Sequence, residues 1–183
     1  AIDTSTNPRE IPEKLLFRQD DDTLDVALYL DKQMIEELRI NDPISCLSES
    51  NIVPFCTALE GVSHFLYLLW NVYYGRAISL FELELQAEID KFVCAAALIS
   101  SQTSMCSLNT LHSRLFGTAQ FDSALTAAEL LRYRRANSLA ALYCKRLLFL
   151  ISSDSNTREM TRDLRRFYRL TSQRKVEHIL RPG

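Results

Sequence analysis

The sequence predicts an all-α protein, a single-domain bundle of five or six helices. Only four glycines occur in 183 residues, so the hairpins, phosphate loops and dinucleotide turns that depend on glycine have little material. Apolar residues recur at steps of three and four over several long segments, which is the period of an amphipathic helix. Two segments also begin with the Ser/Thr-x-x-Glu capping box that starts many helices. A chain of this length fits one domain.

Residues 1–22 are expected to form an N-terminal arm, and residues 23–183 the helical domain. The arm contains Pro8, Pro12 and the acidic run "QDDD", a composition typical of a segment that is flexible unless it packs on the body. The following acidic stretch is not an EF-hand loop, because no twelve-residue register has glycine at position six and glutamate at position twelve.

The first helix is predicted over residues 24–39. It is expected to end near "INDP", because Pro43 disfavours helical backbone at Asp42. Five apolar residues share one face of this predicted helix: Leu24, Ala27, Leu30, Met34 and Leu38.

A second helix is predicted over residues 51–74, buried on most of its circumference. Its apolar stripe consists of Ile52, Phe55, Leu59, Val62, Leu66, Leu69 and Tyr73. A narrow polar stripe beside it consists of Glu60, His64, Tyr67, Asn71 and Tyr74. These polar residues interrupt the roughly 20 apolar residues that a membrane span needs, so no integral membrane segment is expected.

An antiparallel helical hairpin is predicted over about residues 51–102. Gly75 offers a helix stop, and Ser79 with Glu82 forms a capping box for the next helix. Residues 100–109 are expected to be a loop, and residues 111–123 a short helix and turn.

The last third of the chain predicts two long helices. Thr126 with Glu129 forms the second capping box, and the helix that it begins continues to Ile151. The cluster at Ser155 to Thr157 is expected to cap a helix over residues 157–170, and a short terminal segment follows. Five arginines gather on one side of this helix: Arg158, Arg162, Arg165, Arg166 and Arg169.

One group of polar residues has the composition of a catalytic or metal site. If the helical hairpin is antiparallel, Glu60 and His64 on one helix come near Glu84 and Glu88 on the other, with His112 as a further candidate. Carboxylate and imidazole ligands suit iron, manganese or zinc. Tyr67 and Asn71 are expected to line the same groove. The alternative interpretation is a solvated polar edge with an ion pair between Glu88 and Lys91.

The common catalytic templates find no match. The sequence lacks Glu-x-x-His pairs, H-E-x-x-H, the Walker A loop, G-x-S-x-G and paired zinc-binding cysteines. No cofactor is therefore identified. Five cysteines, odd in number and mostly in apolar surroundings, indicate reduced core residues of a cytoplasmic protein, and the first ten residues do not resemble a signal peptide.

Charge is distributed unevenly along the chain. The net charge is −2, but residues 1–50 carry −7 and residues 132–183 carry +9. We therefore expect a non-catalytic interaction or regulatory module that binds an acidic protein surface through the five arginines. Alternatively, these arginines pair with the acidic N-terminal region. The sequence is also compatible with a nucleic-acid-binding protein, to which Arg132, Arg134 and Arg135 would contribute, and with a metal-dependent enzyme.

Overall fold

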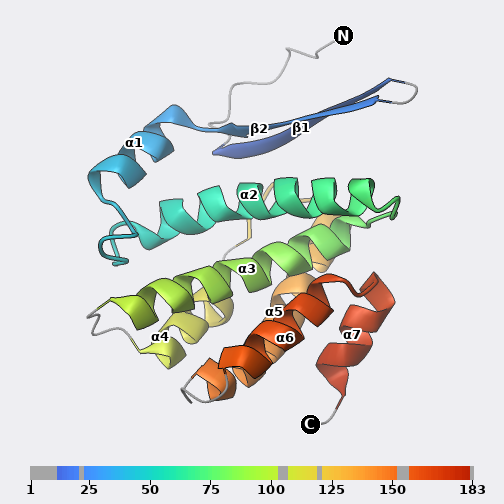
Figure 1. Ribbon diagram of the computed structural model, residues 1–183. Coiled ribbons are helices and arrows are strands. Elements are labelled where there is room, and N and C mark those ends of the chain that lie inside the picture. The colour runs from blue at the N-terminus through green and yellow to red at the C-terminus, as the bar shows by residue number, and fades with distance from the viewer. Residues whose placement is uncertain (1–11, 21–22, 103–106, 119–120, 152–156, 182–183) are drawn as a thin grey trace.

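The computed structural model describes residues 12–20, 23–102, 107–118, 121–151 and 157–181, and these form a mostly helical fold with one small β-hairpin (Figure 1). Strands β1 (Glu13–Asp20) and β2 (Thr23–Leu30) come first. Seven α-helices and a π-helical turn then follow within the described residues: α1 (Lys32–Ile40), α2 (Ile52–Tyr73), α3 (Leu80–Ser101), α4 (Leu108–His112), η1 (Ser113–Gly117), α5 (Ala127–Ile151), α6 (Thr157–Tyr168) and α7 (Ser172–Leu180).

The β-hairpin corrects the predictions of a helix over residues 24–39 and of an arm through residue 22. β1 pairs antiparallel with β2, from Glu13 opposite Leu30 to Asp20 opposite Thr23. The residues of β2 alternate between exposed and half-buried, because Leu24, Val26, Leu28 and Leu30 face the helices. This alternation has the period of two that marks a half-buried strand. Residues 1–11 of the expected arm lie outside the described residues.

Helix α1 therefore begins later than predicted, after the hairpin. Asp31 caps it by accepting hydrogen bonds from the backbone N–H groups of Gln33 and Met34, as expected of an N-cap aspartate. The helix ends at Ile40, as the proline at position 43 predicts.

The antiparallel hairpin of α2 and α3 is confirmed. Gly75 adopts a left-handed backbone with φ of 61° and ends the α2 segment. The capping box at the start of α3 is complete, because the Ser79 side chain accepts from the Glu82 N–H and the Glu82 side chain accepts from the Ser79 N–H. The second capping box is also present, since the Thr126 and Glu129 side chains make the same reciprocal bonds at the start of α5.

The buried face of α2 differs from the predicted one. Four residues of the expected polar stripe, Glu60, His64, Tyr67 and Asn71, face the interior, and Tyr67 and Asn71 are almost fully buried, whereas Tyr74 is exposed. Part of the expected apolar core is instead exposed, including 54% of Leu66, 37% of Leu69 and 82% of Tyr73. Several polar groups of α2 find partners, which lowers the penalty for burying them: Glu60 accepts from Lys91 and Ser63 donates to Asp90 on α3, and Asn71 donates to the Tyr67 carbonyl.

Helix α3 lies at the centre of the fold. It packs against α2 on one side and α5 on the other, and the β-hairpin covers α2 (Figure 1). Gly61 permits the close approach of the hairpin, because a Cβ atom there would lie 2.9 Å from both Glu13 and Leu28. The core comprises apolar residues of α3, α5 and the helices around them, among them Leu85, Ile89, Phe92, Ala140, Tyr143, Leu147, Phe167 and Ile179.

Helices α6 and α7 close the end of the chain. Phe167 of α6 stacks on Tyr143 of α5 at a ring-centroid distance of 4.3 Å, and Ile179 of α7 is buried in the same core. The expected cap at residues 155–157 falls mainly outside the described residues.

Among the described helices, only α2 is long and apolar enough to cross a membrane, judged by length and composition. Core helices of soluble proteins satisfy the same criterion.

Candidate functional site

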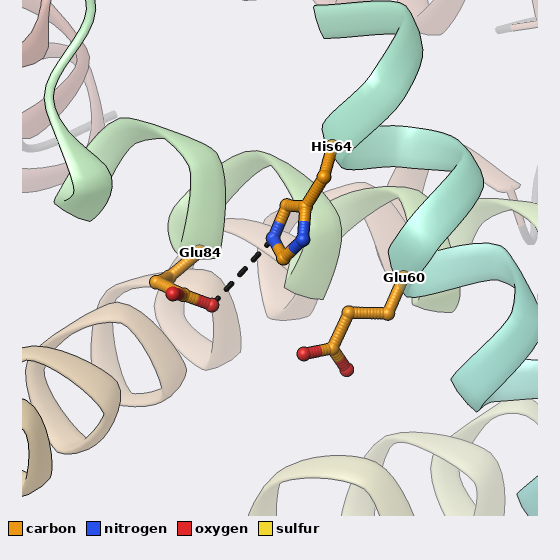
Figure 2. A group of neighbouring side chains, drawn as sticks. All are labelled: Glu60, His64 and Glu84. Carbon is orange, nitrogen blue, oxygen red and sulfur yellow. Dashed lines mark ion pairs between the residues drawn. The ribbon is translucent and has the colours of Figure 1, made fainter. Parts of the chain in front are cut away.

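Glu60, His64 and Glu84 converge between α2 and α3. One possible ligand atom from each lies within 4.8 Å of those from the other two, and the side chains point toward one another (Figure 2). His64 Nε2 lies 3.6 Å from a carboxylate oxygen of Glu84, which is longer than a hydrogen bond. Both side chains are about nine-tenths buried, with exposed fractions of 13% and 9%. Glu60, His64 and Glu84 together place an imidazole and two carboxylates in a space largely shielded from solvent.

Helical geometry explains why these side chains meet. Glu60 and His64 are four residues apart on α2, so they lie one turn apart on the same face. Glu84 and Glu88 have the same relationship on α3, and the two helices pack antiparallel. The face of α3 that carries Glu84 is therefore directed at the face of α2 that carries His64.

Lys91 separates Glu88 from the three converging residues. Its ammonium group donates to Glu60 Oε2 at 2.9 Å and to Glu88 Oε1 at 2.8 Å. The ion pair between Glu88 and Lys91 that the sequence suggests is thus present, and Glu60 shares the same lysine. The second oxygen of Glu60, Oε1, receives no hydrogen bond from a described residue and remains able to bind another group.

Glu13 and Arg132 complete the surroundings of this site. The Oε2 atom of Glu13 on β1 is buried without a hydrogen-bond partner among the described residues. Arg132 of α5 places its Nε 3.9 Å from Glu84 Oε1, also without a hydrogen bond. Sequence reasoning misses both contributions, because it predicts an arm where strand β1 forms and assigns Arg132 to a different surface.

The electrostatics of the site favour a positive charge at its centre. Burial alone would lower the pKa of His64, but the carboxylates of Glu84, Glu60 and Glu13 outweigh burial and raise it. Burial raises the pKa of Glu13 and of Glu88. For Lys91, the attraction of Glu60 and Glu88 overcomes burial and raises the pKa, so the ammonium stays charged.

Tyr67 and Asn71 do not join this group. Asn71 donates to the Tyr67 carbonyl at 2.7 Å, and the Tyr67 ring lies against Tyr168 of α6 rather than toward Glu84. His112 is also elsewhere. Its Nε2 lies 2.9 Å from the Ala141 carbonyl oxygen, and its ring packs on Phe116.

A second buried polar group surrounds Lys175 of α7, which has no exposed surface. Its ammonium donates to Gln86 Oε1 at 2.6 Å and faces the rings of Tyr67 and Phe167 at 4.4 and 4.8 Å. The network extends through Asp90, which accepts from Gln86 at 2.8 Å and from Ser63 at 2.6 Å.

Burial of the ammonium lowers the pKa of Lys175 to about 7, although Glu82 and Asp90 partly oppose this shift. No signal in the sequence distinguishes this lysine from the basic residues around it, because its burial depends on where α7 docks.

The five arginines of α6 and its end form an exposed surface, here called the arginine ridge: Arg158, Arg162, Arg165, Arg166 and Arg169. An open groove of about 910 Å³ runs along it. Within the described part of the chain, none of the five guanidinium groups makes an ion pair, and the acidic hairpin lies on the opposite side of the molecule (Figure 1). Pairing between the ridge and described acidic residues of the N-terminal region is therefore not observed.

The three arginines of α5 that are candidates for nucleic-acid binding differ in their surroundings. Arg132 turns toward Glu84, whereas Arg134 and Arg135 are exposed. Arg135 stacks over the Phe81 ring at 4.9 Å.

Comparison of the chain with models of protein families, with curated protein sequences and with solved structures finds no match.

Proposed function

We propose that the protein is a non-catalytic interaction module that binds an acidic protein segment through the arginine ridge. The observation that carries this proposal is that five exposed guanidinium groups, four on α6 and one just after it, have no carboxylate partner among the described residues. Exposed arginines without an ion-pair partner cost little folding free energy, because water solvates them. They form a positively charged surface that can attract an acidic partner. The four free thiols of the described residues support a reducing, cytoplasmic location as part of the same proposal.

The spacing of the ridge suits an acidic helix. Arg158, Arg162, Arg165 and Arg169 repeat at steps of four, three and four residues and span about 16 Å along the helix axis. An acidic helix with carboxylates at the same steps presents them over the same length. Each guanidinium can then accommodate one carboxylate with two parallel hydrogen bonds.

Two features favour a protein over a nucleic acid. The groove along the ridge is lined by arginine, threonine and leucine, without an aromatic side chain on which a base could stack. A net positive charge is also found only over residues 132–183, while the whole chain is slightly acidic, unlike a domain built to follow a phosphate backbone.

The test is charge reversal of the ridge. Wild-type protein, the R162E/R165E double variant and the K14E/K32E control are titrated with a fluorescent poly-glutamate peptide and with a DNA duplex at two salt concentrations. The control changes the net charge equally, at exposed lysines of β1 and α1. We expect the peptide to bind wild type and the control alike, and the ridge variant to lose roughly tenfold or more in affinity, since favourable charge contacts at both positions become repulsive.

Thermal unfolding provides the folding control, because reversing exposed unpaired arginines should leave stability nearly unchanged. If DNA binds wild type more tightly than the peptide does, and the ridge variant loses that binding, the partner is a nucleic acid and not an acidic protein. Equal binding of the peptide by the ridge variant and the control would refute the proposal.

A further inference from the structure

We infer that Glu60, His64 and Glu84 bind one divalent transition-metal ion, next to the buried carboxylate of Glu13 on the β-hairpin. This inference is independent of the arginine ridge, which lies on a different helix. The proposed ion is of the class that accepts mixed nitrogen and oxygen ligands, namely zinc, manganese or iron. One imidazole and two carboxylates are the ligand types of several protein metal centres.

The geometry supplies free donor atoms at the right place. His64 Nε2 is buried and has no hydrogen-bond partner among the described residues. The nearest oxygen of Glu84 is 3.6 Å away, too far for a hydrogen bond but close to the separation of two ligands that share a metal bonded at about 2.0–2.2 Å to each. Glu60 contributes Oε1, since Lys91 occupies only its Oε2.

Glu13 provides the second, independent observation. Its Oε2 is buried without a partner among the described residues, and a Cβ atom on Gly61 would lie 2.9 Å from that oxygen. The carboxylate therefore lies over the α2 backbone between Glu60 and His64. A buried, unpaired carboxylate oxygen is costly, and a cation at this position would remove that cost.

The charge of the site also favours a cation. The carboxylates of Glu13, Glu60 and Glu84 lie close to His64, and that of Glu88 lies beyond Lys91, whereas the fixed positive charges are those of Lys91 and Arg132. With neutral His64 and ionised carboxylates the group carries a charge of −2, which a divalent ion would neutralise. Because Glu13 belongs to β1, a cation beside its carboxylate would also strengthen the contact between the β-hairpin and α2.

The inference is tested by adding Zn²⁺ and Co²⁺ to the purified full chain after chelator treatment. Calorimetry with Zn²⁺ should show one site per chain. Co²⁺ should develop visible absorption bands typical of nitrogen and oxygen coordination, which report the ligands directly without any variant. Mg²⁺ should not compete at comparable concentrations, because it retains its water shell and prefers all-oxygen ligands.

Two neighbouring substitutions then separate ligation from general electrostatics. E84Q and E88Q each remove one negative charge from the same face of α3, one turn apart. We expect E84Q and H64Q to weaken Zn²⁺ binding by a hundredfold or more, E13Q by roughly tenfold, and E88Q by less than about threefold. Far-UV circular dichroism identifies any variant that fails to fold, and the Co²⁺ spectrum of the wild-type chain then provides the ligand test.

Proton competition gives a further readout. A metal ion binds the neutral imidazole and ionised carboxylates, so the Zn²⁺ affinity of wild type should fall as the pH is lowered. Absence of Zn²⁺, Mn²⁺ and Fe²⁺ binding by the folded wild-type chain would overturn the inference. Equal weakening by E84Q and E88Q, or unchanged binding in H64Q, would overturn it as well, since the ion would then bind elsewhere.

Discussion

Replacing Lys175 with methionine should remove a pH dependence of stability that the wild-type protein carries. Methionine is similar in length and apolar, so K175M keeps most of the packing between α7 and α3 while removing the buried ammonium. The level of stability can shift in either direction, because Gln86 loses its donor. The informative quantity is the change in the free energy of unfolding with pH.

The sign follows from the protons bound in each state. The pKa of Lys175 is about 7 in the folded protein, against an ordinary value of 10.5 for an exposed lysine. Between these two values the unfolded chain binds the proton and the folded chain does not, so stability rises with pH. One proton corresponds to about 1.4 kcal/mol per pH unit. The rise from pH 7 to pH 9 is therefore about 2 kcal/mol. This value is an upper bound, since the rings of Tyr67 and Phe167 favour the ammonium.

Urea unfolding, followed by circular dichroism at pH 7, 8 and 9, measures this change. Burial raises the pKa of Cys56 to about 11 and also raises that of Cys144, so ionisation of these thiols in the unfolded chain reduces stability toward pH 9. The same thiols are present in both proteins, so the difference between them isolates Lys175. Parallel curves for wild type and K175M, within about 0.5 kcal/mol, would refute the assignment of Lys175 as a lysine that is buried without its proton above pH 7.

Two further predictions concern the core. L85A should destabilise the protein by about 2–5 kcal/mol because Leu85 has no exposed surface. L69A should cost only about 1 kcal/mol because 37% of Leu69 is exposed. Urea unfolding at pH 7 measures both losses of stability, and equal losses would contradict the assigned buried face of α2. Y143F should cost about 1–2 kcal/mol, since it removes the 2.8 Å hydrogen bond from the Tyr143 hydroxyl to Asp163, and a neutral result in the same assay would show that this bond contributes nothing net.

The parts of the fold that the sequence predicts correctly depend on local interactions. The capping boxes at Ser79 and Thr126 involve residues three apart, and the stop at Gly75 depends on one residue's backbone freedom. Their signals lie within a single turn of chain. The helix boundaries near these residues therefore agree with the structure to within a residue or two.

The errors occur where two periods compete. Over residues 23–30, Leu24, Ala27 and Leu30 suggest a helical face, while Leu24, Val26, Leu28 and Leu30 alternate as in a strand. A neighbouring strand decides between these patterns, because β1 supplies the hydrogen bonds that β2 needs. A segment expected to be a flexible arm offers no such partner, so the sequence pattern alone favours the helix.

The buried face of α2 is predicted wrongly for a related reason. Hydrophobic periodicity predicts that the most apolar stripe of a helix is buried. It contains no information on the hydrogen-bond partners that a neighbouring helix offers to a polar side chain. His64 lies opposite Glu84 of α3, and Ser63 donates a hydrogen bond to Asp90 of the same helix. Asn71 donates to the Tyr67 carbonyl one turn earlier on α2. Only the antiparallel placement of α3 is predictable from the sequence, and it brings Glu60, His64 and Glu84 within range without fixing their distances.

The polar residues along α3 have a consequence for how this sequence can diverge. Glu84 faces α2 and Arg132, Gln86 faces Lys175, and Lys91 holds Glu60. A buried leucine can be replaced by methionine without a second substitution elsewhere. A buried charge whose partner is lost, in contrast, strongly destabilises the protein. Substitutions at these positions should therefore be inherited in pairs across helices, so related chains would be recognised by linked changes at residues such as 86 and 175 rather than by constancy at either one.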